Sequence, residues 1–144
     1  MMERPFDILL VEDNAADIGL TDEALREAST PYTLHVARDG EDALAFLRRQ
    51  GTHAGQPRPD LILLDLNMPR KGGREVLAEI KEDSDLRRIP VVVLTTSSDL
   101  DDIRAAYNLH ANCYLVKPVD LSQFFNAIAA LKGFWLSVVT LPSE

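Results

Sequence analysis

Acidic, hydroxyl and basic side chains follow four apolar runs of the sequence, at the point where each run ends. Glu12 and Asp13 follow "DILLV", and Asp65 follows "LILL" in the stretch "LILLDLNMP". Thr95 closes "IPVVVLT", and Lys117 follows "CYLV". Three carboxylates gathered in one place repel one another, so such a cluster needs a cation or a proton to be stable. The pattern therefore raises the question whether these four ends meet in the fold.

The residue types favour magnesium over zinc at such a cluster. Mg²⁺ takes hard oxygen ligands, uses few protein carboxylates and keeps several waters. A zinc site is disfavoured because Cys113 is the only cysteine and the three histidines, His35, His53 and His110, are scattered along the chain. A magnesium ion with few protein ligands usually completes its shell with phosphate oxygens.

A phosphoryl group would give the other side chains a role. Lys117 would supply a point charge to the group, and Thr95 would supply a hydroxyl donor. The carboxylate of Asp65 can itself be the nucleophile and form an aspartyl phosphate. Asn67 could offer its backbone carbonyl to the metal where the chain turns before Pro69. Asp65 is therefore the candidate phosphate acceptor.

Each of these residues also has an ordinary structural reading when it is taken alone. An aspartate after a strand usually starts a loop, and Glu12 with Asp13 could cap the helix that follows. Thr95 could be a plain strand end, Lys117 a solvated charge, and Tyr114 a core or edge aromatic. The joint pattern, in order along a chain of suitable length, favours the chemical interpretation.

Apolar runs of strand length alternate with segments of helical period, which predicts five β-strands and five α-helices. We expect strands at 6–11, 32–37, 61–64, 89–95 and 113–116, and helices at 15–28, 41–50, 74–81, 99–109 and 121–132. Ser97 or Ser98 would cap the fourth helix. This alternation is typical of the (βα)5 doubly wound α/β class, with a parallel sheet and right-handed crossovers. In either common strand order of that class, the site lies at the carboxyl ends of the central strands.

The composition indicates one soluble domain and excludes several kinds of partner. The 144 residues, of which 46% are hydrophobic and 26% charged, suggest a single core. The net charge of -8 argues against non-specific binding to nucleic acid or to an anionic membrane. A single cysteine forms no intramolecular disulfide and fits a reducing cytoplasm. No apolar run suits a signal peptide or a membrane span.

Four motifs, "ILLVEDN", "LILLDLNMP", "IPVVVLTTSS" and "YLVKP", together resemble the receiver domain of two-component response regulators. The resemblance covers residues 6–131 and implies a flavodoxin-like fold with the strand order 2-1-3-4-5. It implies that Asp65 accepts a phosphoryl group from a histidine kinase in a Mg²⁺-dependent phosphorelay. Asp13 would bind the metal directly, Glu12 partly through water, and Asn67 through its main-chain carbonyl.

The same resemblance implies switching roles. Lys117 would pair with the phosphoryl group, Thr95 would be the switch hydroxyl, and Tyr114 would be the coupled aromatic that changes rotamer. A cis peptide bond would precede Pro118. His110 stands where many receivers have a glycine, which puts the loop geometry ahead of the last strand in question.

The segments "YNLHANCYLVKP" and "GFWLSVVTLP" resemble stand-alone regulators that partner phytochrome-type histidine kinases, and the long loop 51–59 suits that subgroup. A bacteriophytochrome is one candidate kinase. We expect a single receiver domain over 1–144, with its core at 6–131, an apolar extension at 132–144 and no output domain. Its output would then be a protein contact, or onward transfer to a histidine phosphotransfer protein.

The extension carries too many apolar residues for a solvated end. They could pack on the same domain, or they could form a two-fold homodimer interface, where aromatic residues are enriched. We favour the homodimer. Its predicted interface residues are Tyr114, Phe124, Phe125, Ile128, Phe134, Trp135 and Val138.

Three other functions are consistent with parts of the pattern. Hydrolases with an aspartate nucleophile often need a second acid two residues later, where this chain has Asn67, so turnover beyond slow loss of its own phosphate is disfavoured. A nucleotide-binding fold is disfavoured, because it needs a G-x-G-x-x-G motif after the first strand and this chain has "VEDNAAD" there. A receiver that no longer takes phosphate and serves only as a scaffold is also disfavoured, because it would not need the five chemical positions and this chain has all of them.

Overall fold

Five strands and five α-helices alternate along the chain in the computed structural model, which describes residues 5–27, 30–68 and 71–142, except the side chains of 137 and 138. The strands are β1 (Phe6–Val11), β2 (Tyr32–Ala37), β3 (Leu61–Leu64), β4 (Val91–Thr95) and β5 (Cys113–Val116). The helices are α1 (Ala15–Arg26), α2 (Gly40–Leu47), α3 (Gly73–Glu82), α4 (Leu100–Asn108) and α5 (Leu121–Gly133). Short 3-10 helices lie at Gly51–His53 and Leu86–Arg88, and a π-helical segment, Phe134–Val138, continues α5.

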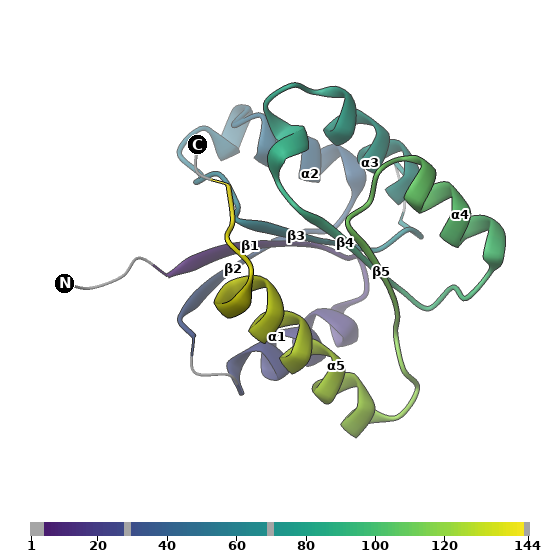
Figure 1. Ribbon diagram of the computed structural model, residues 1–144. Helices are drawn as coiled ribbons and strands as arrows, with labels where there is room; N and C mark the ends of the chain where they lie inside the picture. The colour runs from purple at the N-terminus through teal and green to yellow at the C-terminus, as the bar shows by residue number, and fades with distance from the viewer. Residues whose placement is uncertain (1–4, 28–29, 69–70, 143–144) are drawn as a thin grey trace.

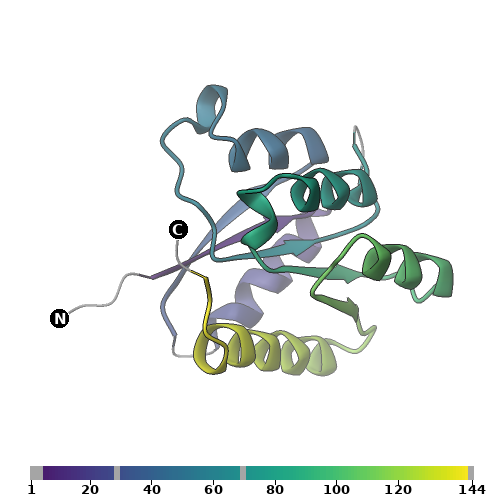
Figure 2. The ribbon, with the colours of Figure 1, turned by 45° about the horizontal axis from the view of Figure 1, so that its top comes forward.

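The strands form one parallel sheet with the order β2-β1-β3-β4-β5, which confirms the predicted fold class and strand order. Helices α1 and α5 cover one face of the sheet, and α2, α3 and α4 cover the other (Figures 1 and 2). Across the described residues, no helix combines the length and the apolar character needed to cross a bilayer.

Alternate residues of the central strands fill two cores, one on each face of the sheet. One core joins β1, β3 and β4 to α2 and α3, and the other joins the same strands to α1 and α5. Every residue of β3 and β4 is buried. A strand that is covered on both faces has no room for a polar side chain until it ends. The fold therefore confines the polar residues of these strands to the carboxyl edge of the sheet.

Strands β1, β2, β3 and β5 have the predicted bounds, whereas β4 begins two residues later than predicted. Ile89 closes the preceding 3-10 helix by donating its N–H to the carbonyl of Leu86, and Pro90 has no N–H to give to the sheet. Helix α2 ends at Leu47 and not at residue 50, because Arg49 adopts a left-handed conformation with φ of 56°. Ala28, at the predicted end of α1, lies outside the described residues.

Asp99 caps α4, so the prediction of Ser97 or Ser98 was wrong. The Asp99 carboxylate accepts a hydrogen bond from the N–H of Asp101, as an N-cap side chain does. After the same helix, His110 has φ of 68°, in the left-handed region that favours glycine. Histidine thus takes the backbone conformation that glycine adopts readily, and β5 still follows at the predicted position.

The C-terminal extension packs on its own domain. Lys132 is 1% exposed, and its Nζ donates to the carbonyl of Leu25 at 2.6 Å and lies 4.4 Å from the centre of the Tyr32 ring. An ammonium group is favourable beside the last carbonyls of a helix and over an aromatic face. This contact therefore ties α5 to the end of α1. Leu136 of the π-helical segment is buried in the core of the same face.

Two residues of the predicted dimer interface are internal. Phe124 and Ile128 are buried in the core between α1, α5 and the sheet, so they do not belong to a surface that a second chain could reach. Apolar partners within the same chain cover this side of α5. Phe134 is exposed, whereas Phe125 and Trp135 are half-buried.

Helix α3 begins against the backbone of Asp65, where only a glycine fits. A Cβ atom at Gly73 would lie 2.4 Å from the carbonyl oxygen of Asp65 and 2.5 Å from the Cα of Leu66. These main-chain atoms continue β3 and cannot move aside easily. We expect Gly73→Ala to lower the free energy of unfolding by about 3 kcal/mol, measured by urea denaturation.

Gly19→Ala is the matched control. Gly19 lies in the middle of α1, and its Cβ position has no neighbouring atom within 4 Å outside the helix backbone. Alanine should therefore raise the free energy of unfolding by about 0.5–1 kcal/mol. Equal stability of Gly73→Ala and the native protein would contradict the close contact between α3 and β3.

Candidate functional site

Main-chain hydrogen bonds continue the sheet one residue beyond its strands. The N–H groups of Glu12, Asp65 and Lys117 donate to carbonyls of neighbouring strands at 2.9, 3.0 and 2.7 Å. The residues that follow β1, β3 and β5 are therefore fixed in the geometry of the sheet. Their side chains lie at its carboxyl edge, where the sequence predicted a site.

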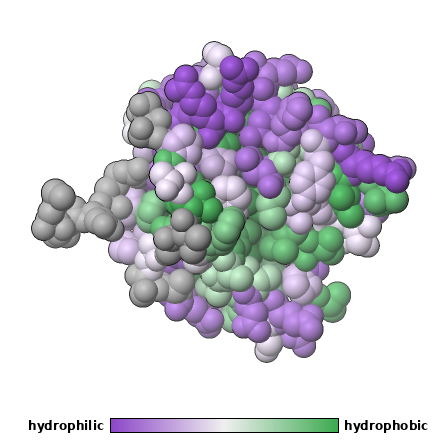
Figure 3. Space-filling model, in the orientation of Figure 1, coloured by the Kyte–Doolittle hydropathy of each residue, from purple (hydrophilic) through white to green (hydrophobic). Residues whose placement is uncertain are grey.

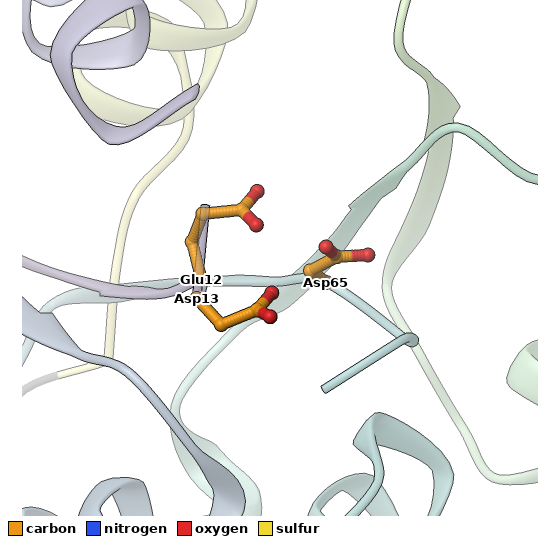
Figure 4. Close-up of side chains that lie close together, drawn as sticks. All are labelled: Glu12, Asp13 and Asp65. Carbon is orange, nitrogen blue, oxygen red and sulfur yellow. The ribbon is translucent and has the colours of Figure 1, made fainter. Parts of the chain in front are cut away.

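The carboxylates of Glu12, Asp13 and Asp65 come together at this edge. One oxygen of each lies within 4.8 Å of the others. Figure 4 shows the three side chains around a common space at the ends of β1 and β3. Glu12 and Asp65 are buried, whereas Asp13 is exposed. Three carboxylate donors with one open side fit a hard divalent cation that keeps part of its water shell.

One ammonium group bonds to this cluster. Nζ of Lys117 donates a short hydrogen bond to Glu12 and a second one, of 2.9 Å, to Oδ2 of Asp17, and it lies 3.8 Å from Oδ2 of Asp65. Burial lowers the pKa of Lys117, but the hydrogen bonds to Glu12 and Asp17 outweigh burial, so the pKa lies above its ordinary value. Lys117 therefore remains a cation at neutral pH.

The loop between β4 and α4 is held at Ser97. Its N–H donates to Oγ1 of the fully buried Thr95 at 3.5 Å, and its carbonyl accepts from the hydroxyl of Tyr114 at 2.9 Å. The Ser97 hydroxyl donates to Asp102 at 2.6 Å, and Asp102 also forms an ion pair with Arg74 of α3. The predicted switch residues Thr95 and Tyr114 therefore contact the same loop residue.

Sequence reasoning missed Asp17, Ser97, Asp102 and Arg74. Asp17 could have been found, because "VEDNAAD" places it in the first helical turn after β1 and thus at the carboxyl edge. Ser97 was considered only as a helix cap. Its contact with Tyr114 depends on how β5 packs beside the loop after β4, and the ion pair of Asp102 with Arg74 depends on how α3 packs beside α4, so no local pattern in the sequence reports them.

Two details of the predicted site concern the turns after the strands. The N–H of Asn67 donates to Oδ1 of Asp65 at 3.3 Å, and the metal-binding role of its carbonyl stays a prediction. The peptide bond before Pro118 is trans, since no cis bond occurs in the described residues, so the cis prediction was wrong. Trans is the isomer that X-Pro bonds favour, by about 0.5–1 kcal/mol.

Comparisons with known proteins agree with one another. The family model for the response regulator receiver domain matches residues 8–129. The response regulator Rcp1 of Synechocystis sp. is 54% identical over 136 residues, which are 94% of this chain and 92% of Rcp1. The crystal structure of the phosphorylated cyanobacterial phytochrome response regulator RcpA matches with a TM-score of 0.94 and 55% identity, covering 97% of this chain and 100% of that chain. The crystal structure of the Mn²⁺-bound form of Rcp1 matches with a TM-score of 0.92 and 54% identity, covering 96% of this chain and 100% of that chain.

Glu12 makes the stability of the metal-free protein depend on pH. Burial raises the pKa of Glu12 from 4.5 to about 7, although the hydrogen bond from Lys117 lowers it, and the charge of Asp65 raises it further. Between pH 4.5 and about pH 7 the folded state therefore holds more protons than the unfolded state, so the free energy of unfolding falls as the pH rises. We expect a loss on the order of 2 kcal/mol between pH 4.5 and pH 7, measured by urea denaturation in a chelating buffer.

Glu12→Gln should remove this part of the pH dependence, because glutamine stays neutral throughout. Added Mg²⁺ should restore the stability of the native protein at pH 8, since a bound cation favours the ionised carboxylate. A native profile that keeps its slope in Glu12→Gln would assign the effect to another group.

Proposed function

Because this chain belongs to the response regulator receiver domain family, we propose that it signals by accepting a phosphoryl group on Asp65 from a histidine kinase. The observation that carries the proposal is the meeting of Asp65 with two further carboxylates and a buried ammonium group. The close likeness to the phosphorylated form of RcpA adds support.

The transfer needs one nucleophile and a set of fixed charges. An oxygen of Asp65 attacks the phosphorus atom of a phosphohistidine, the bond from phosphorus to nitrogen breaks, and the released histidine nitrogen takes up a proton from solvent. Lys117 pairs with the oxygens of the transferred group, and the hydroxyl of Thr95 donates to them. Asp65 stays in place because its backbone is bonded to β1 and packs against Gly73.

Glu12, Asp13 and Asp65 would hold Mg²⁺, with the main-chain carbonyl of Asn67 as a further ligand. The ion would neutralise charge on the phosphoryl oxygens during the transfer. The oxygen donors of the cluster support this assignment, as does the Mn²⁺-bound form of Rcp1.

A phytochrome-type histidine kinase, with bacteriophytochromes among the candidates, is the proposed phosphodonor. The support is that RcpA is a phytochrome response regulator. A histidine phosphotransfer protein would be a second partner if the group is passed on. The proposed location is the cytoplasm, where the single cysteine would stay reduced.

The signal would be a change in protein contacts. A phosphoryl group on Asp65 draws the hydroxyl of Thr95 away from the N–H of Ser97, and the hydrogen bond from Tyr114 to Ser97 then changes with the loop. Because these residues end β4 and lie in β5, the surface of α4, β5 and α5 is altered. A hydrolase is the weaker alternative, since Asn67 has an amide where a general acid would stand.

Phosphorylation of Asp65 is tested by the intact mass of the protein after treatment with acetyl phosphate and Mg²⁺. We expect a single phosphate adduct on the native chain, because one carboxylate of the cluster is the nucleophile. The adduct should be absent when Mg²⁺ is chelated and in Asp65→Asn. Asp101→Asn, which changes an exposed aspartate of α4, is the matched control and should keep the adduct.

An adduct that persists in Asp65→Asn would contradict the assignment of the acceptor. A folded native protein that takes no adduct would contradict the proposed function and favour the scaffold reading.

We also propose a homodimer in which the exposed Phe134 takes part. Phe134 is 53% exposed and meets Trp135 edge to face, with ring centres 5.7 Å apart. Figure 3 shows apolar surface over the C-terminal half of α5 and toward β5. Tyr114 and Phe125 are half-buried and could complete this interface, and the side chain of Val138 lies outside the described residues.

Phe134→Ser should weaken such a dimer at least tenfold, because an exposed aromatic ring at an interface contributes strongly to binding. The measurement is the dissociation constant from sedimentation equilibrium. Leu100→Ser is the matched control, since Leu100 is similarly exposed, at 56%, but lies on α4. Dissociation by Leu100→Ser alone would place the interface on α4 instead.

A further inference from the structure

Asp17 is a fourth carboxylate beside the cluster, and it is not one of the three that could hold a metal ion. The three converging carboxylates are Glu12, Asp13 and Asp65. Oδ2 of Asp17 lies 2.9 Å from Nζ of Lys117, whereas Oδ2 of Asp65 lies 3.8 Å from the same atom. The ammonium group therefore hydrogen-bonds Glu12 and Asp17, and not the carboxylate that would accept phosphate.

An acidic residue in the first turn of a helix commonly has a capping role, and the contacts show that Asp17 does not complete one. Asn14 is the N-cap residue of α1, and its side chain accepts from the N–H of Asp17. In a capping box, the carboxylate three residues later would accept from the N–H of the N-cap residue. Here the N–H of Asn14 donates to Oε2 of Glu12 at 3.3 Å. The carboxylate of Asp17 is thus available to Lys117.

The backbone holds Asp17 in this position. Its N–H donates to Asn14 at 3.0 Å, and its carbonyl accepts from the hydroxyl of Thr21 at 2.7 Å. The side chain of Asp17 is 33% exposed, while that of Lys117 is 6% exposed. A rigid helix thus presents one charge to a lysine that is enclosed by the site.

We propose that Asp17 is a positioning residue that holds Lys117 away from Asp65 in the unphosphorylated protein and thereby slows phosphoryl transfer. The inference rests on the proposed function, in which Lys117 pairs with the transferred group. To do so, the ammonium group must leave Asp17, and the loss of that hydrogen-bonded ion pair adds to the barrier. Asp17 acts only through Lys117 and touches no reacting atom.

Asp17→Asn tests this role, because asparagine keeps the shape and removes the charge. We expect the rate of phosphorylation by acetyl phosphate, at saturating Mg²⁺, to rise three- to tenfold. Glu23→Gln is the matched control, since Glu23 is an exposed acid on the same helix, and its rate should equal that of the native protein. Asp17→Glu, which restores the charge, should return the rate toward the native value.

A double-mutant cycle separates positioning of Lys117 from a general effect of charge on the phosphodonor. In the Lys117→Ala background, Asp17→Asn should leave the residual rate unchanged, because no ammonium group remains to be held. A crystal structure of metal-free Asp17→Asn gives a second readout. It should show Nζ of Lys117 at hydrogen-bonding distance from Asp65, closer than the 3.8 Å of the native chain.

The outcomes distinguish the two proposals. A native chain that takes no phosphate would overturn both the proposed function and the slowing by Asp17. A native chain that is phosphorylated at the same rate as Asp17→Asn would overturn only the role of Asp17. A faster rate that persists in the Lys117→Ala background would also overturn it, because the effect would then be on the approach of the anionic donor.

Discussion

One buried ammonium group lies among the carboxylates at the carboxyl edge of the sheet, and the rest of the site depends on it. Lys117 is within 4 Å of Glu12, Asp17 and Asp65. Like charges repel strongly where water is excluded, so the cluster is stable only with a proton, an ammonium group or a metal ion present. The proposed phosphoryl transfer also depends on the ammonium group and the metal ion. The free energy of unfolding is therefore coupled to which of these cations lies beside the carboxylates.

The architecture accounts for where this concentration of charge can occur. Strands β3 and β4 are buried along their whole length, and the last four residues of β1 are buried as well, with one core on each face of the sheet. Toward the carboxyl ends of these strands, polar side chains can therefore appear only where a strand stops, and parallel strands all stop at the same edge. A cavity of about 410 Å³ lies away from the cluster, between residues such as Arg58, Arg88 and Pro142. The cluster itself has an exposed acid at its margin, which suits a phosphoryl group carried by another protein.

Strand bounds, strand order and the converging carboxylates could be predicted because they follow from local apolar runs and from one set of motifs. The place of Asp17 at the carboxyl edge could be predicted as well, but its contact with Lys117 could not, since the distance between them depends on how α1 packs across the sheet. The same limit applies to Phe124 and Ile128, whose apolar character fits a core or an interface equally well. Packing of α5 on α1 decides between them, and Lys132 fixes that packing from inside.

The two sides of Asp65, the proposed acceptor, are held in different ways. Toward α3, main-chain atoms of Asp65 touch Gly73 with no room for a methyl group. Toward α4, the loop is held by side-chain hydrogen bonds centred on Ser97. In the proposed function, a change at Asp65 would therefore reach the surface through the loop after β4 and through β5, while β3 and α3 would keep their positions. New partner proteins could therefore evolve to bind the surface of α4 and β5 without any change in the residues around Asp65.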